Sequence, residues 1–127
     1  MLVPDRMKKI YENTIKSVGP MAKEFFSEKM LILFGDSAPD ELKDYCFVID
    51  VVEVKEEIQA GDVLYIDDEK FTITSVGDVV CQNLSRLGHI TLKFDGSTNP
   101  QLLGTLHLEQ KELPKIEAGT KLKIMKE

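Results

Sequence analysis

The stretch IQAGDVLYI, residues 58–66, returns near the C-terminus as IEAGTKLKI, residues 116–124. Both copies follow the pattern I-x-A-G-x-x-L-x-I, in which a glycine precedes alternating apolar residues. Glycine readily adopts the positive φ of a tight turn, and period-two alternation places the Leu and the Ile on one face of a strand. Each copy therefore predicts a turn that leads into a half-buried strand. We interpret the repetition as a common turn-into-strand arrangement that occurs twice, and not as a duplication of one segment.

Short alternating segments separated by Gly, Asp and Pro continue over the rest of the chain. Strands are expected at residues 10–18, 30–34, 45–54, 63–66, 71–76, 89–94, 105–109 and 120–125, with a hairpin loop at 67–70. Many short strands of this kind are typical of barrels and sandwiches. The sequence therefore predicts a mainly β fold with a β-barrel or sandwich-like core.

Two short helices are expected to interrupt the strands. The first spans residues 20–29, because Pro20 suits the first helical position and apolar residues follow at helical spacing. The second spans 79–87, where Asp78 can cap the start and Gly88 suits a left-handed stop. Residues 40–44 could add one helical turn.

Length and composition bound the class of protein. The chain has 127 residues, 43% of them hydrophobic and 30% charged, which predicts one globular domain over 1–127. If Met7 is the natural start, residues 1–6 are an N-terminal extension. The formal charge of −6 argues against nucleic acid as a general partner. No apolar run reaches the roughly 20 residues of a membrane span, so no membrane insertion and a cytoplasmic location are expected.

Cysteine and histidine usage predicts neither a metal nor a cofactor. Cys46 and Cys81 have no CxxC spacing, and His89 and His107 lie far apart in the chain. Both cysteines are expected to be free thiols at or near the core. No Gly-rich phosphate loop or HExxH motif is present.

The two histidines are the candidate chemical groups. In GHITLKF (residues 88–94), His89, Thr91 and Lys93 alternate with the core residues, and in TLHLE (105–109) His107 does the same. Period two therefore predicts that both imidazoles lie off the core, where water or a partner reaches them. A neutral imidazole can accept a phosphoryl group, and Lys93 and Thr91 would supply a cation and a hydroxyl beside His89. On these residues alone, an ordinary hydrogen-bonded strand histidine is the favoured interpretation of each.

Three longer segments carry a family resemblance: DYCFV (44–48), NLSRLGHITLKFDG (83–96) and GTLH (104–107). Together with 10–19 and 30–32 they resemble the glucitol/sorbitol-specific enzyme IIA component of the bacterial phosphoenolpyruvate-dependent sugar phosphotransferase system. The resemblance covers about residues 7–127. It implies a cytoplasmic β-rich phosphocarrier that takes a phosphoryl group from the histidine-carrying protein HPr and passes it to a IIB component, without a cofactor, while the hexitol is imported.

The resemblance also places the family's phosphohistidine shortly after the Tyr-Cys-Phe segment, where this chain has Ile49. Isoleucine cannot carry phosphate. Three interpretations follow: His89 is the acceptor and the first candidate, His107 is the acceptor and the second candidate, or the chain is a non-phosphorylatable binding or regulatory module of the same system.

Overall fold

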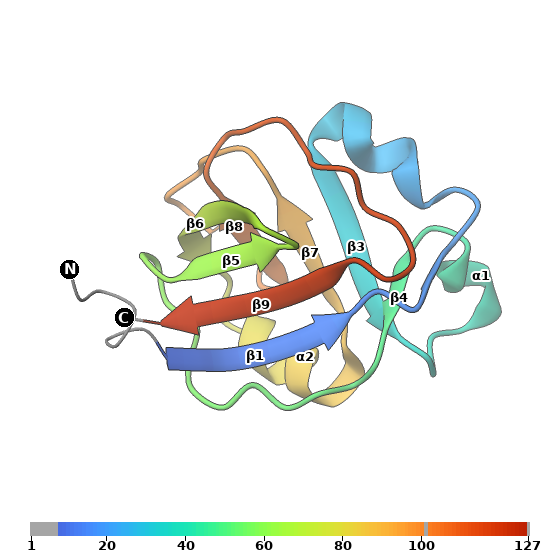
Figure 1. Cartoon of the computed structure of the whole chain (residues 1–127), viewed down its shortest axis with the longest axis horizontal. Coiled ribbons are helices and arrows are strands. Elements are labelled where there is room, and N and C mark those ends of the chain that lie inside the picture. Colours follow the sequence, from blue (N-terminus) through green and yellow to red (C-terminus); the bar gives the residue numbers. More distant parts are fainter. Residues whose placement is uncertain (1–7, 101, 127) are drawn as a thin grey trace.

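Nine strands form one curled sheet in the computed structural model, which describes residues 8–100 and 102–126 (Figure 1). The strands are β1 (Lys8–Thr14), β2 (Ser17–Val18), β3 (Met30–Gly35), β4 (Phe47–Ile49), β5 (Val63–Ile66), β6 (Glu69–Val76), β7 (Ile90–Lys93), β8 (Thr105–Leu108) and β9 (Lys121–Lys126). Their order across the sheet is β1-β9-β5-β6-β8-β7-β3-β4-β2. The expected mainly β fold is confirmed.

The two edges of the sheet belong to one continuous segment, because only Ile15 and Lys16 separate β1 from β2. The Ile15 N–H donates to the Thr120 carbonyl at 2.8 Å, and the next N–H, of Lys16, donates to Val48 at 2.8 Å. One bend therefore holds β9 on one side and β4 on the other. The strand expected at 10–18 is divided at this bend.

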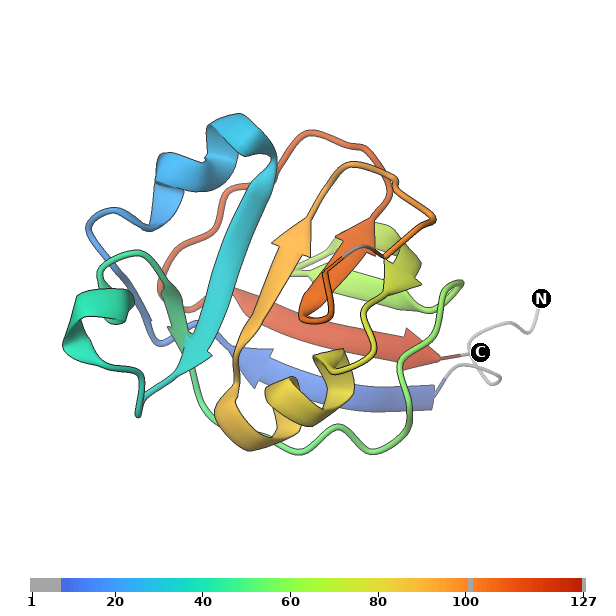
Figure 2. The same ribbon diagram turned by 180° about the vertical axis from the view of Figure 1, so that it is seen from behind.

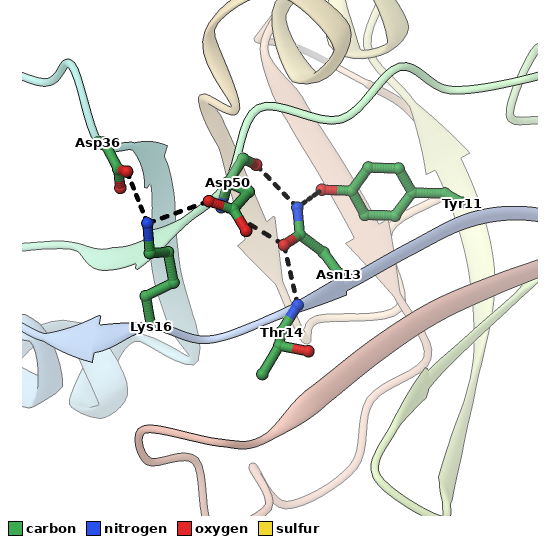
Figure 3. A network of polar contacts seen from close by, with 6 residues as sticks. All are labelled: Tyr11, Asn13, Thr14, Lys16, Asp36 and Asp50. Carbon is green, nitrogen blue, oxygen red and sulfur yellow. Dashed lines mark hydrogen bonds and ion pairs between the residues drawn. The ribbon is translucent and has the colours of Figure 1, made fainter.

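A buried asparagine fixes the bend (Figure 3). Asn13 Nδ2 donates to the Tyr11 hydroxyl at 2.7 Å and to the Asp50 carbonyl at 2.8 Å. Close by, Lys16 Nζ pairs with Asp36 at 2.6 Å and with the Asp50 carboxylate at 3.0 Å. These contacts join β1 to the chain that leaves β3 and β4.

Both expected helices are present, with differences in detail. The first is a 3-10 helix, η2 (Ala22–Glu28), that ends at Lys29 with φ of +62°. The second is α2 (Val80–Leu87), and Gly88 ends it with φ of +67° as expected. The predicted Asp78 cap is wrong, because the N-cap residue is Val79 and no side chain caps the helix. The expected helical turn is α1 (Asp40–Lys43).

The long strand expected at 45–54 is wrong beyond Ile49. Beyond Ile49, backbone N–H groups form hydrogen bonds with side chains of α2 instead of with a strand. The Val54 N–H donates to Ser85 Oγ at 3.0 Å, and the Ile58 N–H donates to Cys81 Sγ at 3.2 Å. Polar side chains of the helix thus replace a neighbouring strand. The hairpin loop is also shorter than expected, because Ile66 already pairs with Glu69.

The repeated stretch forms two turns of the same construction. In each, the second residue's N–H donates to the side chain of the fifth: Gln59 to Asp62 at 2.8 Å, and Glu117 to Thr120 at 3.0 Å. The glycine of the turn has φ of +100° in the first copy and +96° in the second. The strands that follow, β5 and β9, pair antiparallel, so the two copies lie side by side.

The inner face of the curled sheet carries the core, and the outer face of β3 carries a smaller apolar cluster. Inward residues of three adjacent strands alternate as expected: Leu31, Leu33, Ile90, Leu92, Leu106 and Leu108. On the outer side, Phe34 packs with Ala38 and Cys46. Seen from behind, β3, β7 and β8 lie next to one another (Figure 2).

Candidate functional site

Strand register places the two imidazoles on the same outer face of the sheet. Thr91 of β7 pairs with Ile32 of β3 on one side and with Thr105 of β8 on the other. Lys93 pairs with His107 one step further along. Residues two apart share a face, so His89, immediately before β7, lies four residues back along this face, roughly 13 Å from the level of His107. The two rings lie in separate hollows.

His107 is held by a carboxylate. Its Nδ1 lies 2.8 Å from Asp95 Oδ1, and the side chain is 8% exposed. An ionised carboxylate only accepts hydrogen bonds, so the proton of a neutral imidazole lies on Nδ1 and the lone pair lies on Nε2. Among residues 8–100 and 102–126, no side chain or backbone group hydrogen-bonds to Nε2. Nε2 is therefore the ring nitrogen whose lone pair is available to a partner.

The expected exposure of His107 is wrong, although the predicted face is right. The chain between β7 and β8 folds back over the outer face of β8 and covers it. Thr74 and Ser75 of β6 both donate their hydroxyls to the Ser97 carbonyl, at 2.6 and 3.1 Å. The Ser97 N–H in turn donates to Asp95 Oδ1 at 3.0 Å. This crossover segment therefore brings the carboxylate to the histidine and holds it there.

Opposing effects act on the Asp95 carboxyl. Burial raises its pKa, but the hydrogen bonds from His107 and the Ser97 N–H, with the positive charge of Lys93, lower it more. The net result is a pKa below the ordinary value for aspartate. Asp95 is thus an anion at neutral pH, as an orienting partner for an imidazole must be.

A polar cleft of about 230 Å³ surrounds His107. Its lining residues come from β7, β8 and the crossover: Lys93, Asp95, Ser97, Asn99, Leu102, Thr105 and His107. A cation, a hydroxyl and an amide therefore stand around the imidazole. Such groups stabilise the negative charge of a phosphoryl group.

His89 lies in different surroundings. Its Nδ1 is 3.3 Å from the Leu33 carbonyl, and its ring stacks on Phe34 with the centroids 4.1 Å apart. The ring borders an apolar groove of about 330 Å³, lined by Phe25, Ile32, Phe34, Leu42, Tyr45, Cys46 and His89. Among the described residues that line the groove, none is a lysine or an arginine that would pair with phosphate.

Of the two supporting residues expected beside His89, Lys93 lies beside His107 instead. Lys93 is the register partner of His107 and lines its cleft, and Thr91 pairs with Thr105. The sequence could not show this arrangement, because the parallel pairing of β7 with β8 joins segments that lie 14 positions apart. Lys93 therefore belongs to the His107 cleft.

Ile49, at the position the family resemblance assigns to a phosphohistidine, is fully buried in β4. It pairs with Gly35. Cys46 is buried and Cys81 half-buried, both as free thiols, as expected. Within the described residues, no group of three or more His, Cys, Asp or Glu side chains could hold a metal ion, and no helix is long and apolar enough to cross a membrane.

Sequence reasoning did not single out Asp95, Ser97 or Asn99. These residues belong to the stretch DGSTNP (95–100), which predicted only a loop. A usable signal was present: an Asp two residues before a Ser often accepts that residue's backbone N–H. The contact to His107, twelve positions away, has no local signature.

Comparisons with known proteins point to one family. The family model described as "PTS system glucitol/sorbitol-specific IIA component" matches residues 10–123. Two proteins named "PTS system glucitol/sorbitol-specific EIIA component", from Shigella flexneri and Escherichia coli (strain K12), are each 36% identical over 117 residues, which is 92% of this chain and 95% of theirs.

A solved structure agrees with these relatives. The crystal structure of a PTS system IIA component from Enterococcus faecalis V583 superposes with a TM-score of 0.78 at 33% identity. The superposition covers 88% of this chain and 97% of the other. The curled sheet is thus shared with a protein of the same system.

Proposed function

Because the chain belongs to the glucitol/sorbitol-specific IIA family of the sugar phosphotransferase system, we propose that it is a cytoplasmic phosphoryl carrier that relays phosphate from HPr to a IIB component. The relay would serve the uptake and phosphorylation of glucitol. One observation carries the choice of acceptor: His107 is oriented by Asp95 at 2.8 Å in a cleft that also holds Lys93.

The first transfer uses the lone pair of His107 Nε2. Nε2 attacks the phosphorus of the donor's phosphohistidine, the new N–P bond forms, and the N–P bond to the donor imidazole breaks. The donor ring leaves with that electron pair. His107 keeps its Nδ1 proton, and its ring becomes positively charged while it carries the phosphoryl group. Asp95 stabilises this positive charge through the Nδ1 hydrogen bond.

The second transfer reverses these roles. A nucleophilic side chain of the IIB component attacks the phosphorus, and the bond to Nε2 breaks and returns the electron pair to His107. In both steps the three phosphoryl oxygens spread negative charge, which Lys93 and the polar groups of the cleft stabilise. In each step a new bond to phosphorus forms as an N–P bond breaks, so the relay needs no ATP.

The test is phosphorylation by the upstream components. The protein is incubated with phosphoenolpyruvate, enzyme I and HPr, and its intact mass is measured. The expected result is a gain of one acid-labile phosphate that is absent in His107→Gln and retained in His89→Gln. The two variants are matched controls for each other, because each removes one of the only two imidazoles.

Two other outcomes would change the proposal. If phosphate is lost in His89→Gln and retained in His107→Gln, His89 is the acceptor despite its apolar surroundings. If active upstream components add no phosphate to the unmodified protein, the relay is wrong.

The second candidate function is a non-phosphorylatable binding or regulatory module of the same system. The observation that favours it is Ile49, an aliphatic and fully buried side chain where the family resemblance implies a phosphohistidine. Binding of HPr or a IIB component without any gain of phosphate would support this module.

A further inference from the structure

The apolar groove beside His89 opens on the same face of the sheet as the His107 cleft. Ile32 of the groove pairs with Thr91, which pairs in turn with Thr105 of the cleft. Two of its lining residues are well exposed, Leu42 at 48% and Tyr45 at 38%. Exposed apolar side chains that gather around a hollow indicate an interaction surface rather than ordinary surface.

Exposed acidic residues are frequent on two segments that supply lining residues of the groove, and their carboxylates are called the acidic rim here. The segments 22–28 and 40–45 supply Phe25, Leu42 and Tyr45. The helix η2 lies beside β3, and α1 lies beyond β4 (Figures 1 and 2). These segments carry five carboxylates, all on exposed residues, against two lysines: Glu24, Glu28, Asp40, Glu41 and Asp44, with Lys23 and Lys43. An apolar hollow with an acidic rim is complementary to an apolar side chain flanked by basic residues.

We infer that this groove docks the protein that donates the phosphoryl group to His107. The donor inserts an apolar side chain between Phe25, Leu42 and Tyr45, and its basic residues face the acidic rim. The inference rests on the proposed function, since it identifies where the donor of that relay binds.

The dimensions fit a protein partner. A standard interface covers about 800 Å² on each side, which corresponds to a patch that reaches roughly 16 Å from its centre. The offset of roughly 13 Å between the levels of His89 and His107 lies within that reach. One partner can therefore occupy the groove and present its phosphohistidine to the cleft.

The experiment separates docking from chemistry by using two phosphoryl donors. Phosphorylated HPr must dock, whereas the small molecule phosphoramidate reaches an imidazole without docking. We expect Tyr45→Ala to raise the HPr concentration at half-maximal rate about tenfold, and to leave the phosphoramidate rate unchanged. The matched control is Tyr65→Ala on β5, four strands from β3, for which both rates should stay unchanged.

Charge reversal tests the acidic rim. Glu41→Lys on α1 should slow association with HPr several-fold at low salt, and the difference should shrink as salt is added. Glu69→Lys, at another exposed glutamate, at the start of β6, is the matched control and should have little effect.

Three results would overturn the inference. HPr kinetics unchanged in both Tyr45→Ala and Glu41→Lys would show that the donor docks elsewhere. Equal slowing of HPr and phosphoramidate would assign Tyr45 to the fold or the His107 cleft. A wild-type dimer that Tyr45→Ala converts to monomer would make a second copy the occupant. Failure of the wild type to take phosphate from either donor would instead overturn the relay itself.

Discussion

Lys93 and His107 are register partners on the neighbouring parallel strands β7 and β8. Their side chains stand on the same face and line the same cleft. The pairing places the positive charge of Lys93 beside the His107 imidazole. The rest of the protein has an excess of negative charge. Within the part of the chain that the structure describes, Lys93 is the only lysine or arginine that lines this cleft.

The first prediction concerns that charge. Lys93→Met should lower the rate of phosphoryl transfer to His107 by about tenfold or more, because charge-assisted contacts contribute about 1.5–3 kcal/mol. The measurement is rapid-quench transfer from phosphorylated HPr. Lys115→Met, far more exposed, is the control for loss of one positive charge. If both variants slow phosphoryl transfer equally, the effect of Lys93 comes from the net charge of the protein and not from its position in the cleft.

The second prediction concerns the orienting carboxylate. Asp95→Asn removes the negative charge that, in the proposed relay, would stabilise the phosphorylated ring of His107. The transfer rate should fall roughly 10- to 100-fold, from the same range of contact energies. Because a merely structural role would not alter the pH dependence of transfer, the pH–rate profile is measured together with the thermal midpoint. Asp78→Asn, on an exposed residue, should change neither. A normal profile in Asp95→Asn would contradict the orienting role.

The third prediction follows from the lowered pKa of Asp95. A carboxyl whose folded pKa lies below its unfolded value stabilises the fold above the unfolded value, near 3.8. That stabilisation is lost as the pH falls below about 4 and through the folded pKa. Urea unfolding between pH 6 and pH 2.5 should therefore show a steeper acid loss for the wild type than for Asp95→Asn. Parallel curves would mean that the folded and unfolded pKa values are the same.

Alternation along β7 and β8 correctly predicted which of their residues face the core, because that pattern is local. The inward positions of β7 and β8 are the expected ones, and His107 lies on the expected face. The cover over that face could not be predicted, because a crossover without regular structure carries no periodic signal. The Asp95–His107 contact and the burial of His107 both depend on it.

The long strand expected at 45–54 failed for a related reason. Its residues have strong β propensity, but propensity does not say whether a neighbouring strand is available. Ser85 and Cys81 of α2 accept the backbone N–H groups of Val54 and Ile58 instead. Satisfying backbone donors is what the fold requires, and side chains of a helix can do so as well as a strand.

The fourth prediction concerns Tyr11, whose hydroxyl is buried against Asn13. Burial raises the pKa of Tyr11 to about 12, a hydrogen bond from Asn13 partly offsets this, and the Asp50 charge adds to it. A folded pKa above the unfolded value of about 10 means stabilisation that is present below pH 10 and lost as the pH rises toward 12. The free energy of unfolding in urea should therefore fall more steeply between pH 10 and 11.5 in the wild type than in Tyr11→Phe. Identical slopes would contradict the buried phenol.

The fifth prediction tests how the backbone before β8 packs against Gly77, in the turn between β6 and α2. A Cβ added at Gly77 would lie 2.2 Å from the Leu103 carbonyl oxygen, so the backbone there must move. The Gly77 N–H also donates to the Thr105 carbonyl at 2.9 Å, next to the His107 cleft. Gly77→Ala should therefore cost about 1–3 kcal/mol of unfolding free energy, as overpacking does.

Gly104→Ala is the matched control for this substitution, because the nearest atom to its added Cβ is Asn83 Nδ2 at 3.8 Å, an ordinary contact. Urea unfolding of both variants gives the free energies. If Gly77→Ala distorts the segment that leads to β8, phosphoryl transfer to His107 should also slow, whereas Gly104→Ala should leave it near the wild-type rate. Equal stability of the two variants would mean that the 102–104 backbone yields without cost and is not a rigid support for the cleft.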